Sequence, residues 1–295
     1  MKFNAVSMAL AVSLLGAAVS VSARGLPPNI EIFELQGSGL SSTYAGQSVR
    51  IPDSVVTAVL ADGFYLQTPD ARADSEDALT SNGIRVVTAG APVYAAGGSV
   101  QVGHLVAATG SISEIAGETR LTVTLPLERI GSSIEPLPTP VEFSVASGKP
   151  RGRPDNLSCF NNLSNFECFE GMRVSLPTGR VATGNTTAAG DDYGPVYVSP
   201  FGERSLREKG LRFGATPVAG NELAGIWDGN PEVLRMDADR LGAVPNGTAI
   251  AGGASFTATG VLTVADGDYT LWPTTLSINA ASNTLPVPVS VPASS

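Results

Sequence analysis

The chain has 295 residues, 15% of them charged, and a formal net charge of −9. This acidic balance argues against a general nucleic-acid coat protein, because phosphate binding depends largely on Lys and Arg. The length is sufficient for two domains of ordinary size. The many glycines and prolines (33 and 21), together with frequent turn dipeptides and the lack of a long amphipathic stretch, favour an all-β protein.

The first 23 residues have the composition of a secretory signal peptide. Lys2 supplies the positive start, residues 5–21 are apolar or small, and VSA at residues 21–23 resembles a cleavage site. No later stretch approaches about 20 apolar residues, the length that spans a bilayer. We therefore expect a secreted chain, extracellular or periplasmic, with no membrane association after cleavage. Cleavage removes one lysine and no acid, so the net charge of −9 becomes −10.

Residues 55–87 predict a three-stranded meander. Two β-branched and apolar runs, VVTAVL and GFYLQT, flank an Asp62-Gly63 turn, which is a strong hairpin signal. A long acidic loop follows, and an Asn82-Gly83 turn leads into a third strand. Such loops are where small β-barrels usually place function.

The sequence contains a weak internal repeat. LVAATGSI at residues 105–112 is echoed by SFTATGVL at residues 255–262, and each is followed by a turn and another strand. The echo favours two copies of one β module. Gly103 and Gly110 indicate the bulges or bends that barrel corners require. Each module therefore suits a small Greek-key barrel, with an ordinary β-sandwich as the alternative.

Proline-rich spacers suggest the domain boundaries. We expect a first module at residues 28–145, a linker at residues 146–168 and a second module at residues 169–285. Residues 286–295 form a tail in which repeated prolines exclude a core strand.

Cys159 and Cys168 are the only cysteines, and both lie in the expected linker. Export permits a disulfide between them. The bridge would close a small loop and contribute about 2–3 kcal/mol. Two unpaired thiols are the alternative.

The long loop of the first module carries four acids within eight residues, namely Asp70, Asp74, Glu76 and Asp77. Carboxylate oxygens are the ligands that hard cations prefer, so Ca²⁺ or Mg²⁺ is the candidate cofactor here. The loop lacks the EF-hand spacing. The composition favours the alternative, a hydrated acidic loop without a metal.

Basic residues concentrate between residues 149 and 212 and are interleaved with aromatic residues. A single-strand groove on an OB barrel combines such basic and stacking side chains. The candidate nucleic-acid contacts are Arg151, Arg153, Arg204, Arg207, Lys209, Arg212, Tyr193 and Tyr197. Alternatively, the aromatic side chains belong to the core and the basic ones to an ordinary surface.

Several motifs resemble the N-terminal region of secreted bacterial nucleases of the endonuclease/exonuclease/phosphatase family. They are GFYLQTP at residues 63–69, TSNGIRV at residues 80–86, WDGNPEV at residues 227–233 and DADRL at residues 237–241. The resemblance covers most of residues 30–285 and implies OB-like modules ahead of a catalytic domain. The expected fold class is therefore all-β, with two tandem OB-like small β-barrels after a signal peptide.

The resemblance does not extend to catalysis. The catalytic domain of that family uses two histidines, an Asn, a Glu and several Asp that hold a divalent metal. This chain has one histidine, His104, within an apolar strand, where a structural role is more common than a catalytic one. Two β modules also leave no room for a further catalytic domain of about 200 residues. We therefore predict no catalytic residue.

Three functional hypotheses remain open. The first is a non-catalytic accessory region that binds extracellular DNA, including the case of a truncated nuclease whose catalytic domain is missing or separate. The second is a secreted surface module that binds protein or glycan. The third is a stand-alone metal-dependent phosphodiesterase, against which the single histidine stands.

Overall fold

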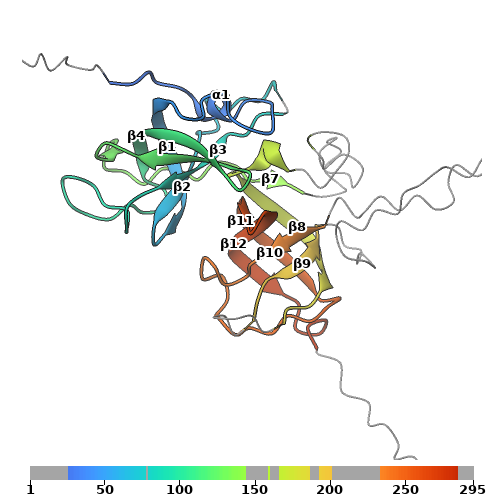
Figure 1. Cartoon of the computed structure of the whole chain (residues 1–295). Helices are drawn as coiled ribbons and strands as arrows, with labels where there is room; N and C mark the ends of the chain where they lie inside the picture. Colours follow the sequence, from blue (N-terminus) through green and yellow to red (C-terminus); the bar gives the residue numbers. More distant parts are fainter. Residues whose placement is uncertain are drawn as a thin grey trace, which may run out of the picture.

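The chain folds into two closed, five-stranded β-barrels (Figure 1). The computed structural model describes residues 26–77, 79–143, 159, 166–186, 193–200 and 233–284. In this part of the chain, no helix is long and apolar enough to cross a membrane. The predicted fold class of two tandem small barrels is confirmed. The predicted signal peptide lies outside the described residues.

The first barrel closes through a pairing between its first and fourth strands. Its strand order is β1-β2-β3-β5-β4, and β4 pairs back onto β1. All these pairings are antiparallel except the parallel pair β3–β5. Its elements are α1 (Ile32–Gln36), β1 (Ser48–Leu60), β2 (Gly63–Gln67), β3 (Gly83–Val87), β4 (Leu105–Ile115), β5 (Glu118–Val123) and the short β6 (Glu128–Arg129).

The second barrel repeats this topology. Its order is β8-β9-β10-β12-β11, β11 pairs back onto β8, and β10–β12 is the parallel pair. Its elements are β7 (Val141–Glu142), the 3-10 helix η3 (Glu167–Phe169), β8 (Arg173–Thr183), β9 (Val196–Ser199), β10 (Leu234–Met236), β11 (Ser255–Ala265) and β12 (Asp268–Ile278).

The sequence echo falls on equivalent strands, β4 and β11. Gly110 and Gly260 occupy the same place in the two barrels, and each lies so close to the backbone of the next strand that a Cβ would collide with it. Each hairpin then turns through a residue pair with positive φ, Ala116-Gly117 and Asp266-Gly267. Such two-residue turns match the twist of the strands that they connect.

The strand β7 lies before the expected domain boundary at residue 145, but it belongs to the sheet of the second barrel. It pairs in parallel with β8, and the neighbouring Phe143 packs between Phe166 and Phe169 in the second core. The second barrel therefore includes residues that we assigned to the first module. The reason is a long-range pairing, to which local sequence composition gives no clue.

The two barrels meet through a buried polar and aromatic contact. Tyr65 on β2 and Trp272 on β12 pack edge to face, with ring centroids 6.0 Å apart. The Tyr65 hydroxyl lies 2.6 Å from Thr263 Oγ1 and 3.1 Å from Glu118 Oε1, and Thr263 also donates to Glu118. Because all three polar side chains are buried, they depend on one another for hydrogen bonds.

A cluster of buried carboxyl groups lies beside this contact. Glu170 is only 1% exposed, and its Oε1 accepts hydrogen bonds from the Thr119 backbone (2.9 Å) and from Gln36 Nε2 (3.3 Å). Burial, followed by the charges of Glu167 and Glu118, raises the pKa of Glu170 well above its ordinary value. Burial likewise raises the pKa of Glu167 to about 7.

We expect the free energy of unfolding to fall as the pH rises from 5 to 8. Glu167 and Glu170 have folded-state pKa values above the value of 4.5 expected when unfolded, so the folded state retains protons that the unfolded state releases. The loss from Glu167 alone would reach roughly 3 kcal/mol. Urea unfolding across this pH range measures it.

Glu170→Gln is expected to flatten this pH dependence, because it keeps the accepting oxygen and removes the titration. Glu76→Gln, on an exposed loop, is the matched control and should leave the slope unchanged. His104 acts in the opposite direction, since its lowered pKa costs stability below about pH 6.5. A wild-type slope that Glu170→Gln leaves intact would contradict the assignment.

Candidate nucleic-acid interface

OB barrels bind nucleic acid on the outer face of their second and third strands. In the first barrel these strands are β2 and β3, where Tyr65 lies directly opposite Arg85. Arg85 donates to both carboxylate oxygens of Asp62 at 3.2 Å. An aromatic ring, a guanidinium group and an acid therefore stand together on this face.

The second barrel covers this face of the first. Val261 on β11 and Trp272 on β12 pack against Ala58, Leu60 and Tyr65 in one buried hydrophobic cluster. The Arg85 guanidinium carbon also lies 5.9 Å from the centre of the Trp272 ring. The first barrel therefore holds its neighbour with the face that binds nucleic acid in OB barrels.

The second barrel presents a similar triad on its equivalent strands. Tyr197 on β9 lies directly opposite Arg235 on β10. The Tyr197 hydroxyl donates to Asp268 Oδ2 at 3.5 Å, as Tyr65 does to Glu118 in the first barrel. Tyr197, Arg235 and Asp268 are all half-buried. We call these three residues the β9–β10 triad.

Acidic groups surround this triad. Arg235 forms an ion pair with Asp266 at 2.7 Å and donates to the Ala265 carbonyl at 3.0 Å. Burial, followed by a hydrogen bond with Asp239 and by the charge of Asp239, raises the pKa of Asp237 to about 6. The net local charge therefore opposes binding to phosphates.

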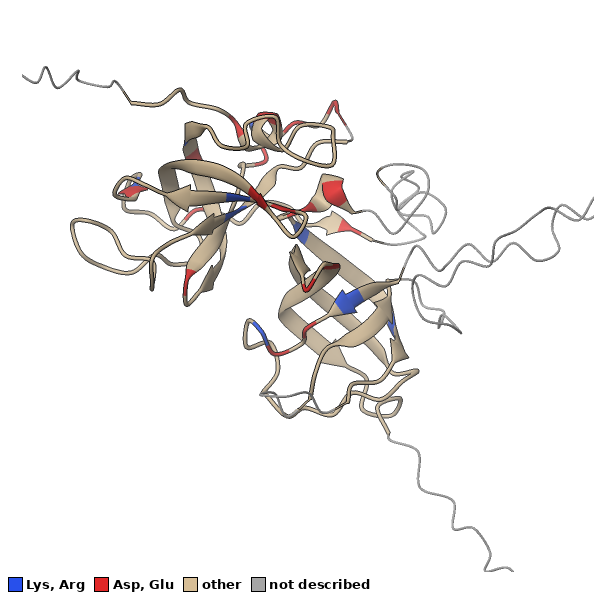
Figure 2. Ribbon diagram, viewed as in Figure 1, with Lys and Arg blue, Asp and Glu red and all other residues tan. Residues whose placement is uncertain are grey.

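The arginines of the described residues are all engaged with protein partners. The blue Lys and Arg positions on the ribbon of Figure 2 are sparse beside the red Asp and Glu positions. Ion pairs hold Arg50, Arg72, Arg85, Arg120 and Arg235, backbone carbonyls hold Arg129, Arg173 and Arg180, and Arg240 lies over the Trp272 ring.

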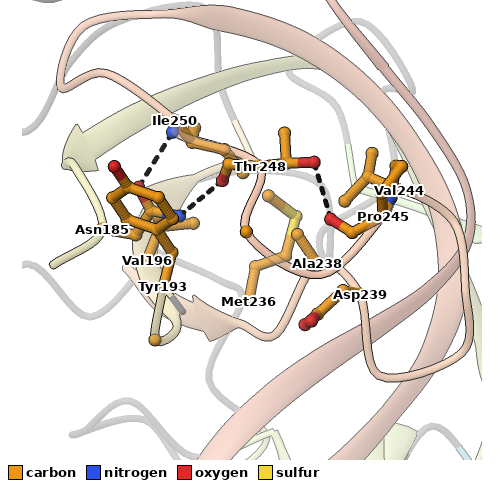
Figure 3. A pocket seen from close by; sticks show the side chains of 12 residues that line it. Asn185, Tyr193, Val196, Met236, Ala238, Asp239, Val244, Pro245, Thr248 and Ile250 are labelled. Carbon is orange, nitrogen blue, oxygen red and sulfur yellow. Dashed lines mark hydrogen bonds between the residues drawn. The ribbon is translucent and has the colours of Figure 1, made fainter. Parts of the chain in front are cut away.

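Most of the predicted nucleic-acid contacts lie outside the described residues. These are Arg151, Arg153, Arg204, Arg207, Lys209 and Arg212. Of the two predicted tyrosines, Tyr197 belongs to the β9–β10 triad. Tyr193 lines a small pocket at one end of the second barrel (Figure 3). The sequence prediction did not include Arg235, although its position between the buried Leu234 and Met236 indicates an outward side chain.

The pocket beside Tyr193 is too small for a nucleotide base. Asn185 spans it, donating to the Thr248 carbonyl at 2.9 Å and accepting from the Ile250 backbone at 2.8 Å (Figure 3). Its cavity volume is about 10 Å³, which is room for about one water molecule. Asn185 therefore fastens two loops rather than forming a ligand site.

The acidic loop uses its carboxylates to cap its own backbone. Asp74 Oδ1 accepts from the backbone of Glu76 (2.9 Å) and Asp77 (3.2 Å), and Oδ2 accepts from Thr80 Oγ1 (3.2 Å). The Glu76 hydrogen bond is the main cause that lowers the pKa of Asp74. Asp77 in turn accepts from the Leu79 backbone at 2.8 Å.

Asp70, the fourth predicted metal ligand, points elsewhere. It accepts from the Thr139 backbone at 3.0 Å and from Thr139 Oγ1 at 2.6 Å, which ties the loop to the chain that leaves the first barrel. In the described part of the chain, no three His, Cys, Asp or Glu side chains are grouped so that they could hold a metal ion.

The two cysteines and the single histidine all lie in the described part of the structure. A disulfide joins Cys159 and Cys168 in the structure, as expected from the sequence. Cys168 lies in the 3-10 helix η3, shortly before β8. His104 is buried in the first barrel, where its Nδ1 lies 2.8 Å from the Tyr94 hydroxyl.

Comparisons with protein-family models, with curated proteins and with solved structures gave no match. The resemblance to secreted nucleases, which rests on short motifs, therefore stays a prediction.

Asp74→Ala is expected to destabilise the protein by about 1–2 kcal/mol, because it leaves the backbone N–H groups of Glu76 and Asp77 without their acceptor, whereas the Thr80 hydroxyl keeps the Asp77 carbonyl. The loss should be the same in EDTA and in millimolar Ca²⁺, since the hydrogen bonds to Asp74 already use three of the about four lone-pair sites of the carboxylate. Urea unfolding measures both quantities, with Glu76→Ala as the control. A stabilisation by Ca²⁺ that Asp74→Ala abolishes would instead reveal a metal site.

Proposed function

We propose that this chain is a non-catalytic accessory region that binds extracellular single-stranded DNA for a nuclease catalytic domain carried elsewhere. The observation that carries this proposal is the β9–β10 triad. It places an aromatic ring beside a guanidinium group on the face that OB barrels use for nucleic acid. The equivalent face of the first barrel is occupied by the second barrel, so the second barrel provides the binding surface.

The chemistry of the triad suits weak binding that tolerates many sequences. Stacking of a base on an aromatic ring such as that of Tyr197 is worth about 1–3 kcal/mol. Arg235 is partly neutralised by Asp266, so it contributes little charge of its own. The predicted basic contacts between residues 151 and 212 would supply the attraction to phosphates. Binding should therefore weaken steeply as salt is added.

A catalytic role fits the sequence less well. A phosphodiesterase of the resembled family uses two histidines, and this chain has one. The Nδ1 atom of that histidine is engaged by Tyr94 and Gln101.

The structure also favours a second candidate, a surface module that binds protein. The observation is that the first barrel uses its Tyr65–Arg85 face to hold another β-barrel. The β9–β10 triad resembles that face in its residues, so it could hold a partner of the same kind.

We expect the chain from Arg24 onward to bind labelled single-stranded DNA at low salt without cleaving it, as measured by fluorescence anisotropy and gel analysis with and without Mg²⁺. Tyr197→Ala should weaken binding by roughly tenfold through lost stacking. Combined reversal of Arg204, Arg207 and Arg212 to Glu should lower the salt slope by about 2 or more, because three phosphate contacts are lost.

Arg50→Glu serves as the charge control, because Arg50 lies on the first barrel in an ion pair with Glu128. It should leave DNA affinity within about twofold of the wild type. Failure to bind at low salt would reject the DNA hypothesis and leave the protein-binding candidate. Cleavage that requires Mg²⁺ would reject the non-catalytic assignment.

A further inference from the structure

The first barrel has a groove on its surface, and none of the residues that line it belongs to the β9–β10 triad. It runs between the hairpin at residues 93–100 and the segment at residues 129–134, and its cavity volume is about 490 Å³. That size is typical of sites for small organic molecules. Tyr94, His104, Arg129 and Ile134 are among the residues that line it.

The hydrogen bonds of His104 fix which ring nitrogen carries the proton. The Gln101 backbone N–H donates to Nδ1 at 3.2 Å, and the Tyr94 hydroxyl lies 2.8 Å from the same atom. A backbone N–H can only donate, so Nδ1 is an acceptor and the neutral ring carries its proton on Nε2. Burial, followed by the charge of Arg129, lowers the pKa of His104 and keeps the ring neutral.

Arg129 brings a positive charge to the same groove. Its Nη2 donates to the Ser132 carbonyl at 2.8 Å, which holds the side chain in place. A guanidinium group has five N–H donors, so this bond leaves others for a ligand. Its charge also acts on both His104 and Tyr94. His104 and Arg129 both line the groove, and the combination of a neutral imidazole N–H donor with a guanidinium cation suits an oxyanion.

Ile134 gives the groove an apolar side. It is 60% exposed and contributes directly to the lining. Gly103, with φ of +82°, lets Ile134 pack against its backbone, since a Cβ there would come within 2.5 Å of the Ile134 side chain. An exposed apolar side chain inside a groove can receive the apolar part of a small ligand.

The second barrel shows that the fold does not require a histidine at this place. Gly253 and Ala254 repeat the backbone bonds of Gly103 and His104: each glycine donates to the first strand of its barrel, and that strand donates back to the next residue. An alanine therefore satisfies the same backbone geometry. The imidazole of His104 is an addition specific to the first barrel.

We infer that this groove binds a small organic carboxylate, with its carboxylate group held by His104 Nε2–H and Arg129 and its apolar body against Ile134. This site is independent of the proposed DNA binding. It predicts that the first barrel, whose OB face is occupied by the second barrel, has a ligand site of its own.

The single histidine gives a direct test. In the ¹⁵N-labelled chain from Arg24 onward, a long-range ¹H–¹⁵N spectrum contains one imidazole, apart from any purification tag, which must be removed. We expect the neutral Nε2–H form at pH 6.5. Titration with hexanoate or benzoate should shift its signals and saturate in the millimolar range or below, and inorganic phosphate should shift them at least tenfold less.

Arg129→Gln is expected to weaken binding of both acids at least tenfold while leaving the histidine tautomer unchanged. Arg180→Gln, which removes the same charge from the second barrel, should leave binding within about twofold. His104→Ala, followed by calorimetry, should abolish binding in a folded protein, because Ala254 occupies the equivalent place. An Nδ1–H tautomer, no saturable shift with either acid, an equal response to phosphate, or unchanged binding in Arg129→Gln would overturn the inference.

Discussion

The arrangement of this protein depends on one buried hydrogen-bonded group, in which Glu118 and Thr263 share the hydroxyl of Tyr65. Glu118 and Tyr65 belong to the first barrel and Thr263 to the second, so neither barrel alone provides all the partners. Leaving a buried polar atom without a partner costs about 1–3 kcal/mol. The two barrels therefore stabilise each other through groups that each would otherwise have to expose to water or bury unsatisfied.

That contact also leaves the two barrels with different exposed faces. It removes the outer face of β2 and β3 from solvent, while the second barrel repeats the same pattern of tyrosine, arginine and acid on β9 and β10. A duplicated fold can thus use one copy of a surface for assembly and the other for a ligand. The groove at His104 is a second difference between the two copies, because the equivalent position in the second barrel is Ala254.

The sequence predicted where several strands lie, but it did not predict which strands and side chains contact each other. Turn residues and alternating apolar residues located β2, β3 and the two repeated hairpins, since these signals are local. The attachment of β7 to β8 and the contact of Tyr65 with Trp272 join residues far apart in the chain, so no local pattern specified them. Tyr197 was predicted as a contact from its basic surroundings. Arg235 was not predicted, because its position opposite Tyr197 follows from the pairing of β9 with β10.

The two barrels contact each other through different faces: β11 and β12 of the second barrel pack against β1 and β2 of the first. The contact is therefore heterologous, or head to tail. A contact between unlike faces does not close on itself, and repeating it generates a filament. Val261 and Trp272, which make this contact on the second barrel, correspond to Ser111 and Thr122 on the first. If the first barrel of a second copy packed on the β9–β10 face in the same way, it would place Ser111 and Thr122 there. The contact within one chain has Val261 and Trp272 at these positions. Two polar substitutions between the repeats thus favour a chain that remains a single pair of barrels over one that polymerises.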